Sequence, residues 1–154
     1  MFPIRRTPSG RRSRGFTLIE VIIVLVVVAI LVALGTPAVA RATGQARVRN
    51  AARVVAGDLE HAFSLAARQR RPVRVAFDEA ALTYAINNRA GVTLRQRNLG
   101  AMSELAVSSM KATTPVLDVF PNGLASGPLT VGLASGNYSL RVTMTRTGKV
   151  RITS

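Results

Sequence analysis

The chain has 154 residues, enough for one modest domain with a small core. It contains no cysteine and a single histidine, which excludes a disulfide framework, a thiolate zinc site and thiol catalysis. Lys and Arg number 21 against 7 Asp and Glu, a formal net charge of +14, and such an excess favours a polyanionic partner or an anionic surface.

The chain begins with a basic segment that carries no acidic residue. Residues 1–15 contain five arginines and two prolines. A run of 25 residues from Phe16 to Ala40 follows, and Glu20 is its only charged residue. A helix needs about 20 apolar residues to cross the hydrocarbon core of a bilayer. We therefore expect residues 16–40 to form a transmembrane helix.

A cleavable secretory signal peptide is the alternative, because it also has a basic start and an apolar stretch. Residues 36–40, TPAVA, resemble its cleavage site, and the product would be a secreted basic binding domain. However, the run exceeds the usual apolar core of about 7–15 residues. A carboxylate at membrane depth is also costly and indicates a function. The positive-inside rule favours a cytoplasmic leader only weakly, because residues 41–55 carry four arginines.

The boundary between the leader and the apolar run carries a recognisable motif. Residues 15–21, GFTLIEV, resemble the processing site of type IV pilins and type II secretion pseudopilins. The resemblance implies that a prepilin peptidase cuts after Gly15 and that Phe16 becomes the methylated N-terminus of the retained helix. It also implies that Glu20 neutralises the free amine of a neighbouring subunit during assembly. The alternative is that Glu20 snorkels to the headgroups.

Beyond Pro37 the apolar residues become periodic. They recur every three or four residues, which is typical of one face of an amphipathic helix: Val48, Ala52, Val55, Leu59, Ala62 and Ala66. Pro72 disfavours a helical conformation in the residue before it, so the amphipathic segment covers residues 41–71. With the membrane-spanning segment it forms one long helix. We expect a bend at Gly35 and Pro37, because proline removes a backbone donor.

From residue 72 onward the apolar pattern has a period of two, which predicts strands. The expected strands are 73–77, 82–86, 92–97, 116–120, 129–133, 138–145 and 149–153, with turns at 78–79, 87–88, 136–137 and 147–148. Residues 100–114 are ambiguous, and we expect a loop there with at most a short helix. The fold class is α+β: a long N-terminal helix packed on an antiparallel β-rich part, residues 72–154, as in type IV pilins.

Two C-terminal segments resemble the GspH/FimT branch of the pilin-like proteins. One is the corner Pro121-Asn122-Gly123, and the other is residues 148–151, GKVR, where lysine replaces the usual arginine. The resemblance implies a minor pseudopilin of the type II secretion system, a non-enzymatic subunit near the tip of the pseudopilus. Its alternative implication is a FimT-like minor type IV pilin in pilus priming or DNA uptake. The lack of cysteine argues against a major pilin.

The basic charge provides a second binding hypothesis. Removal of the five leader arginines lowers the formal charge from +14 to +9. Four basic residues fall on the last predicted hairpin and could contact phosphates: Arg141, Arg146, Lys149 and Arg151. The resemblance implies DNA binding at a comparable end of some FimT-like minor pilins. The alternatives are a solvated surface and one that faces acidic filament neighbours.

No residue pattern indicates catalysis, a metal or a cofactor. Asp58 and Glu60 are two residues apart on the predicted helix and do not face each other. The expected partners are prepilin peptidase, other pseudopilins or pilins, and inner-membrane lipid, with DNA as the further candidate. We expect a single-pass inner-membrane protein with a cytoplasmic leader and a periplasmic C-terminal domain that later enters the filament.

Overall fold

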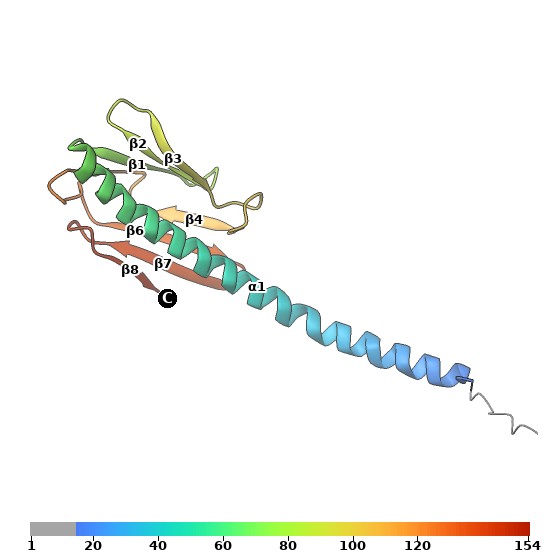
Figure 1. Cartoon of the computed structure of the whole chain (residues 1–154). Coiled ribbons are helices and arrows are strands. Elements are labelled where there is room, and N and C mark those ends of the chain that lie inside the picture. The colour runs from blue at the N-terminus through green and yellow to red at the C-terminus, as the bar shows by residue number, and fades with distance from the viewer. Residues whose placement is uncertain (1–14) are drawn as a thin grey trace, which may run out of the picture. The chain divides into compact units, whose positions relative to one another are not determined.

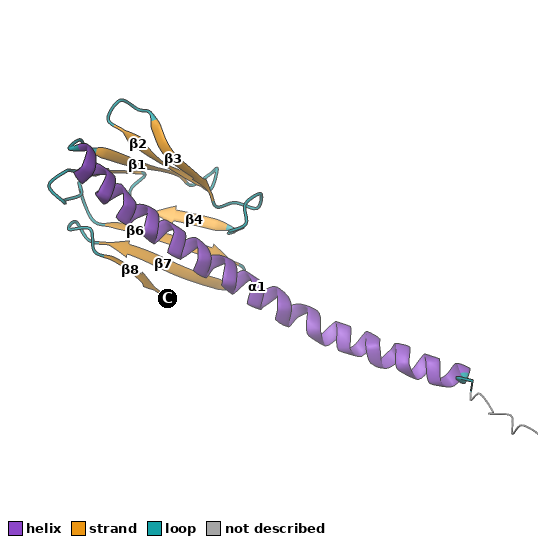
Figure 2. Ribbon diagram, viewed as in Figure 1, coloured by secondary structure: helices purple, strands orange, loops and turns teal. Residues whose placement is uncertain are grey.

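A computed structural model describes residues 15–154, apart from the side chains of residues 35–38. The predicted leader therefore lies almost entirely outside the described residues. The chain divides into two compact parts, Met1–Ala38 and Val39–Ser154. One helix, α1 (Leu18–Gln69), contributes to both parts, and the strands all belong to the second part (Figures 1 and 2).

The first part of α1 is apolar on every side. Its large apolar residues are all exposed, and none of this segment is buried in the structure. A helix that is apolar all round requires an apolar environment, and this one is long enough to cross a membrane. The backbone is helical through Gly35 and Pro37, whose side chains are outside the described set, so the bend stays a prediction.

The second part of α1 packs on the strands through the face that the sequence predicts. All six residues of the apolar stripe are buried: Val48, Ala52, Val55, Leu59, Ala62 and Ala66. The helix ends at Gln69, and Arg70 adopts a left-handed conformation with φ of 52°. Pro72 follows two residues after Arg70, and proline cannot continue a helix.

Eight strands form two antiparallel sheets of four. The first sheet has the order β3-β2-β1-β5, and the second has the order β4-β6-β7-β8. The bounds of the first sheet are β1 Val73–Asp78, β2 Thr83–Asn88, β3 Thr93–Asn98 and β5 Val116–Val119. Those of the second are β4 Ser109–Ala112, β6 Leu129–Ser135, β7 Tyr138–Met144 and β8 Val150–Thr153.

Two sequence expectations were wrong. Residues 100–114 contain a strand, β4, and residues 99–108 form turns and bends without a helix. β4 has four residues, of which only Met110 is fully buried, so its alternation is too short to recognise. The turn expected at residues 87–88 lies at residues 89–91 instead. β2 continues through Asn88, because Asn87 and Asn88 still pair with β1.

The core belongs to the second part of the chain. Among the described residues, the first buried apolar residue is Val48 and the last is Met144. Inner residues of both sheets and the buried face of α1 make one continuous cluster. Residues 39–154 therefore contain everything that a self-sufficient hydrophobic core requires.

Three loops of the second part share one geometry. Each is closed by two backbone hydrogen bonds and has a glycine in the left-handed region at the fourth of its five positions, as in a type I turn followed by a G1 bulge. The loops run 88–92, 120–124 and 145–149, and their glycines have φ of 81°, 78° and 79°. In the third loop, a Cβ on Gly148 would also lie 2.9 Å from the ring of Phe63.

Candidate assembly and binding sites

The start of α1 carries the residues of the predicted processing site. Gly15 and Phe16 precede the helix, and the Phe16 side chain is 81% exposed. The backbone N–H of Glu20 donates a 3.3 Å hydrogen bond to Thr17 Oγ1, which caps the first turn. Sequence reasoning missed this cap, although the Thr-x-x-Glu spacing is a helix N-terminal signal.

Glu20 lies in the first turn of α1 and is exposed. Its carboxylate forms no ion pair with another residue of the described chain. The helix dipole stabilises an acidic residue at this end of a helix. The expected pairing with the amine of a neighbouring subunit is intermolecular and stays a prediction.

The four predicted DNA-binding residues lie on or beside the β7–β8 hairpin and are exposed. Arg141 and Arg151 share the outer face of the second sheet, because Arg141 pairs with Thr153 and Arg151 pairs with Thr143. Lys149 directly precedes β8 in the turn. The structure therefore brings two of these arginines together on one face, with the lysine next to them.

Arg146 has a different environment. Its Nε donates to the carbonyl oxygen of Ala125 at 3.2 Å, and the N–H of Ala125 donates to the carbonyl of Arg146 at 2.8 Å. These bonds connect the loop that follows the Pro121-Asn122-Gly123 corner to the last hairpin. The two C-terminal segments that carry the family resemblance are thus neighbours in space.

Lys111 of β4 belongs to the same outer face as Arg141. Lys111 pairs with Gly132 of β6, and Gly132 pairs with Arg141 of β7. Sequence reasoning missed Lys111 because it placed this residue in a loop. The ten outer positions of the second sheet carry three cations and no carboxylate: Ser109, Lys111, Thr130, Gly132, Ala134, Ser139, Arg141, Thr143, Arg151 and Thr153.

A buried ionic cluster joins α1 to the first sheet. Asp58 is only 4% exposed and is the one buried charged residue of the described chain. Tyr84 of β2 donates its hydroxyl to Asp58 Oδ2 at 2.7 Å, and Arg97 Nε of β3 donates to the same oxygen at 3.0 Å. Arg95 Nη1 donates to Oδ1. The sequence predicted that Asp58 lies on the helix and that residues 92–97, which include both arginines, form a strand, but it indicated no contact between them.

The cluster changes the titration of its members. Burial alone would raise the pKa of Asp58, but hydrogen bonds from Arg97, Tyr84 and Arg95 outweigh it and lower that pKa. Burial and the bond to Asp58 raise the pKa of Tyr84 well above its ordinary value. Asp58 is therefore ionised and Tyr84 is protonated at neutral pH, so the cluster serves as a structural clamp.

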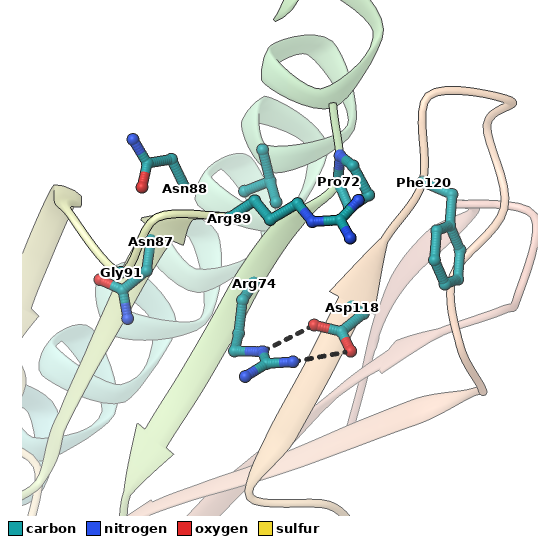
Figure 3. Close-up of a pocket in the computed structure, with 9 residues that line it drawn as sticks. Pro72, Arg74, Asn87, Asn88, Arg89, Gly91, Asp118 and Phe120 are labelled. Atoms are coloured by element: carbon teal, nitrogen blue, oxygen red, sulfur yellow. Dashed lines mark hydrogen bonds and ion pairs between the residues drawn. The ribbon is translucent and has the colours of Figure 1, made fainter. Parts of the chain in front are cut away.

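A cavity of about 450 Å³ opens at one end of the first sheet (Figure 3). Its floor contains a bidentate ion pair, in which Arg74 Nε and Nη2 donate to Asp118 at 2.8 and 3.2 Å. Arg89 and Phe120 also line it. Asp118 neutralises Arg74, whereas Arg89 forms no ion pair within the part of the chain that the structure describes.

The described side chains offer no metal site. Within residues 15–154 there is no group of three His, Asp or Glu residues that could hold a metal ion. His61 is partly exposed on α1, with no second histidine in the chain to act as a co-ligand.

Comparisons with protein families address the N-terminus and the globular part separately. The prokaryotic N-terminal methylation motif matches residues 10–36, which include Gly15, Phe16 and Glu20. The family described as type II transport protein GspH matches residues 51–148, more than half of the chain. The chain belongs to the GspH family.

Solved structures share the fold of this GspH-family chain. The type IV minor pilin FimU of Pseudomonas aeruginosa matches in two crystal forms. One has 16% identity and a TM-score of 0.55, covering 69% of this chain and 92% of FimU. The other has 17% identity and a TM-score of 0.57, covering 70% and 88%. The minor pseudopilin EpsH of the Vibrio cholerae type 2 secretion system has 15% identity and a TM-score of 0.56, covering 70% of this chain and 97% of EpsH.

No curated protein matches the sequence of this chain significantly. The family and the fold together give the chain a structural role of the minor-pilin kind. The methylation motif implies processing by a prepilin peptidase and assembly with pilin-like subunits. With the apolar helix, it makes the chain a membrane-anchored pilin-like protein with a C-terminal globular domain.

Proposed function

We propose that the chain is a minor pseudopilin of the type II secretion system, a non-enzymatic subunit near the tip of the pseudopilus. The observation that carries this proposal is the GspH match over residues 51–148, joined in one chain to a methylation motif. The absence of cysteine supports a minor rather than a major subunit.

Assembly follows from the chemistry of the N-terminus. Cleavage after Gly15 leaves Phe16 with a free amine at the start of a helix whose large apolar side chains are exposed from Leu18 to Leu34. In the bilayer, lipid covers these side chains, and in a filament neighbouring helices replace the lipid. Glu20 then pairs with the amine of the adjacent subunit, which fixes the register between subunits.

The proposed membrane topology follows from the apolar span and the charges on its two sides. The leader, residues 1–15, is cytoplasmic, residues 16–40 span the inner membrane once, and the globular domain is periplasmic. The leader has five arginines and residues 41–55 have four, and the side of the span with more positive charge stays in the cytoplasm. The difference of one arginine favours this orientation. Incorporation into the pseudopilus then removes the span from the membrane.

Processing is tested by intact-mass measurement of the membrane fraction. The wild-type chain is expected to lose 15 residues, and Gly15→Val is expected to remain full length. A mature N-terminus after residue 38 or 40 would instead identify a cleaved signal peptide and overturn the proposal.

Assembly is tested by cross-linking between adjacent subunits. Glu20→Leu is expected to insert into the membrane normally but to be lost from filaments, whereas Glu20→Asp retains the charge and a measurable share of incorporation. Undiminished incorporation of Glu20→Leu would mean that Glu20 only snorkels. Deletion of the gene in its host separates the systems: loss of secreted proteins supports a pseudopilin, and loss of pili supports a minor pilin.

A FimT-like minor pilin that takes up DNA is the second candidate. The observation in its favour is the outer face of the second sheet, where Lys111, Arg141 and Arg151 meet no carboxylate. If this face binds DNA, affinity for duplexes falls steeply with salt. Lys149→Ala with Arg151→Ala is expected to make the log–log salt slope shallower by about two. Arg47→Ala with Arg53→Ala is the charge-matched control, and fluorescence anisotropy measures both.

A further inference from the structure

A pocket lies where the globular part begins, beside the residues that follow the apolar run. One wall is the first turns of α1 after the span, with Ala40, Arg41, Gly44 and Gln45, and the other is the β6–β7 turn, residues 135–138. Its volume is about 400 Å³, which suits a small polar ligand or headgroup. All of the lining residues belong to the second part of the chain.

The walls of this pocket supply hydrogen-bond donors and no carboxylate. The donors are the Arg41 guanidinium, the Gln45 and Asn137 amides and the hydroxyls of Ser135 and Tyr138. Nowhere between residues 21 and 57 does the sequence contain an acidic residue. An anion is therefore the partner that this set of donors favours.

A second arginine lies next to the pocket. Arg49 Nε donates to the Tyr138 hydroxyl at 3.2 Å, and its guanidinium carbon is 5.6 Å from the centre of the Tyr138 ring. This contact orients Arg49 beside a residue that lines the pocket. Neither Arg41 nor Arg49 forms an ion pair in the described chain, so both charges are free to serve a bound phosphate.

The position of the pocket along the chain indicates the source of that phosphate. At a rise of about 1.5 Å per residue, a hydrocarbon core of about 30 Å takes about 20 residues, and from Leu18 these end at Pro37. The headgroup layer adds about 5 to 8 Å on each side, which is about three to five further residues. Arg41 therefore falls at the depth of the lipid phosphates.

We propose that this pocket binds the phosphate of an anionic phospholipid headgroup in the leaflet that faces the globular domain. The bound lipid holds the unassembled subunit against the membrane, and the subunit releases it when the span is drawn into the filament. The inference rests on the membrane anchoring in the proposed function. It concerns a specific site outside the span, rather than the general contact of the span with lipid.

The test uses the full mature chain in detergent micelles, with lipid retention measured by native mass spectrometry. The wild type is expected to retain phosphatidylglycerol in preference to phosphatidylcholine. An arginine near an anionic surface contributes about fivefold in affinity, so Arg41→Gln with Arg49→Gln should reduce the preference about 25-fold. Arg68→Gln with Arg71→Gln removes the same charge from exposed positions at the other end of the amphipathic segment and should leave the preference unchanged.

Gly44 offers a second test that removes no cation. A Cβ on Gly44 would lie 3.7 Å from Ser135 Oγ, an ordinary contact, so a small side chain fits at the wall. Gly44→Asp places a carboxylate in the pocket, and Gly44→Asn is its neutral isostere. We expect Gly44→Asp to abolish the preference for phosphatidylglycerol and Gly44→Asn to retain most of it.

Three results would overturn the inference. One is equal retention of the two lipids by the wild type. Another is an equal loss in the Arg68/Arg71 control, which would indicate diffuse attraction to a basic protein. The third is displacement of the bound phosphatidylglycerol by inorganic phosphate at low concentration, which would indicate a site for a soluble anion. The proposed function is tested by other measurements, the intact mass after processing and the cross-linking of subunits. The lipid site and the proposed function can therefore be contradicted independently.

Discussion

Asp58 depends on partners that are distant in the sequence. Tyr84 and Arg97 reach it from 26 and 39 residues away, and together they connect the middle of α1 to two strands of the first sheet. The Arg95 and Arg97 side chains remain 37% and 43% exposed, so water weakens the charge–charge attraction. The buried carboxylate is the member of the cluster that most needs its partners.

Asp58→Asn should lower the free energy of unfolding by about 2–4 kcal/mol, because it removes a buried, hydrogen-bonded charge and leaves two arginines without their counter-charge. Urea unfolding of residues 39–154, followed by circular dichroism, measures the change. Glu60→Gln is the matched control, since Glu60 is exposed two residues away and should change stability by less than about 0.5 kcal/mol. Equal effects of the two substitutions would contradict a clamp role.

The lowered pKa of Asp58 also predicts a direction for the effect of pH. Its ordinary value is 3.8 and its value in the folded chain is lower. The stability linked to its ionisation is therefore complete above pH 3.8 and is lost as the pH falls through the folded value. Unfolding free energies measured from pH 6 to pH 2 should fall less steeply for Asp58→Asn than for the wild type. Parallel curves for the two proteins would contradict this assignment.

At the scale of elements, the three similar loops offer an internal comparison. Gly91 and Gly148 have nearly the same φ, 81° and 79°, but a Cβ at Gly91 meets open space whereas one at Gly148 meets the Phe63 ring. Gly91→Ala should therefore cost about 1–2 kcal/mol, the penalty of a left-handed alanine. Gly148→Ala should cost about 1 kcal/mol more, because the crowded ring must move.

Thermal unfolding of the two alanine variants measures this difference. Gly123→Ala serves as a second control, since a Cβ at that position also meets open space. Added to Gly148→Ala, the Phe63→Leu substitution should restore the additional unfolding free energy, about 1 kcal/mol, that this variant loses. Added to Gly91→Ala, it should restore none. Equal destabilisation by all three alanines would mean that the ring adapts without cost.

Some elements could be predicted from the sequence because their signals are local. The stripe of α1 repeats over five turns, and the hairpin of β6 and β7 has long alternating strands around Gly136 and Asn137. β4 could not be predicted, because four residues with one buried side chain resemble a loop. The division into two sheets depends on which strands pair at long range, as β1 does with β5, and no local pattern encodes that choice.

The candidate sites also differ in whether their residues form a local sequence motif or come together only in the fold. Gly15, Phe16 and Glu20 form a contiguous motif that can be read directly from the sequence. The outer face of the second sheet required the register of four strands, so Lys111 was missed, and the bond between Arg146 and Ala125 could not be predicted from local sequence. Asp58 was visible as an acidic residue on a helix, but its burial follows only from the position of the first sheet.

At the scale of the whole molecule, the core that the structure describes lies within residues 39–154. Because Val48 is the first buried apolar residue of the described chain, we expect this fragment to unfold in one cooperative transition, with a midpoint that matches the globular domain of the full chain. A fragment that begins at residue 63 loses Val48, Val55 and Leu59 and should not fold. Circular dichroism and denaturant titration test both fragments. A fragment 39–154 without a cooperative transition would contradict a self-sufficient core.

The position of the core also has a mechanical consequence. Any force that extracts the span from the bilayer enters the globular domain through one helix, whose buried face extends from Val48 to Ala66 along its axis. Pulling along that axis loads the helix–sheet contacts in shear, so they must give way together rather than one at a time. Asp58 lies within this face, and its hydrogen bonds to two strands of the first sheet oppose sliding of the helix along the sheet. The globular domain can therefore stay folded while a force on the membrane-spanning segment pulls it toward the filament.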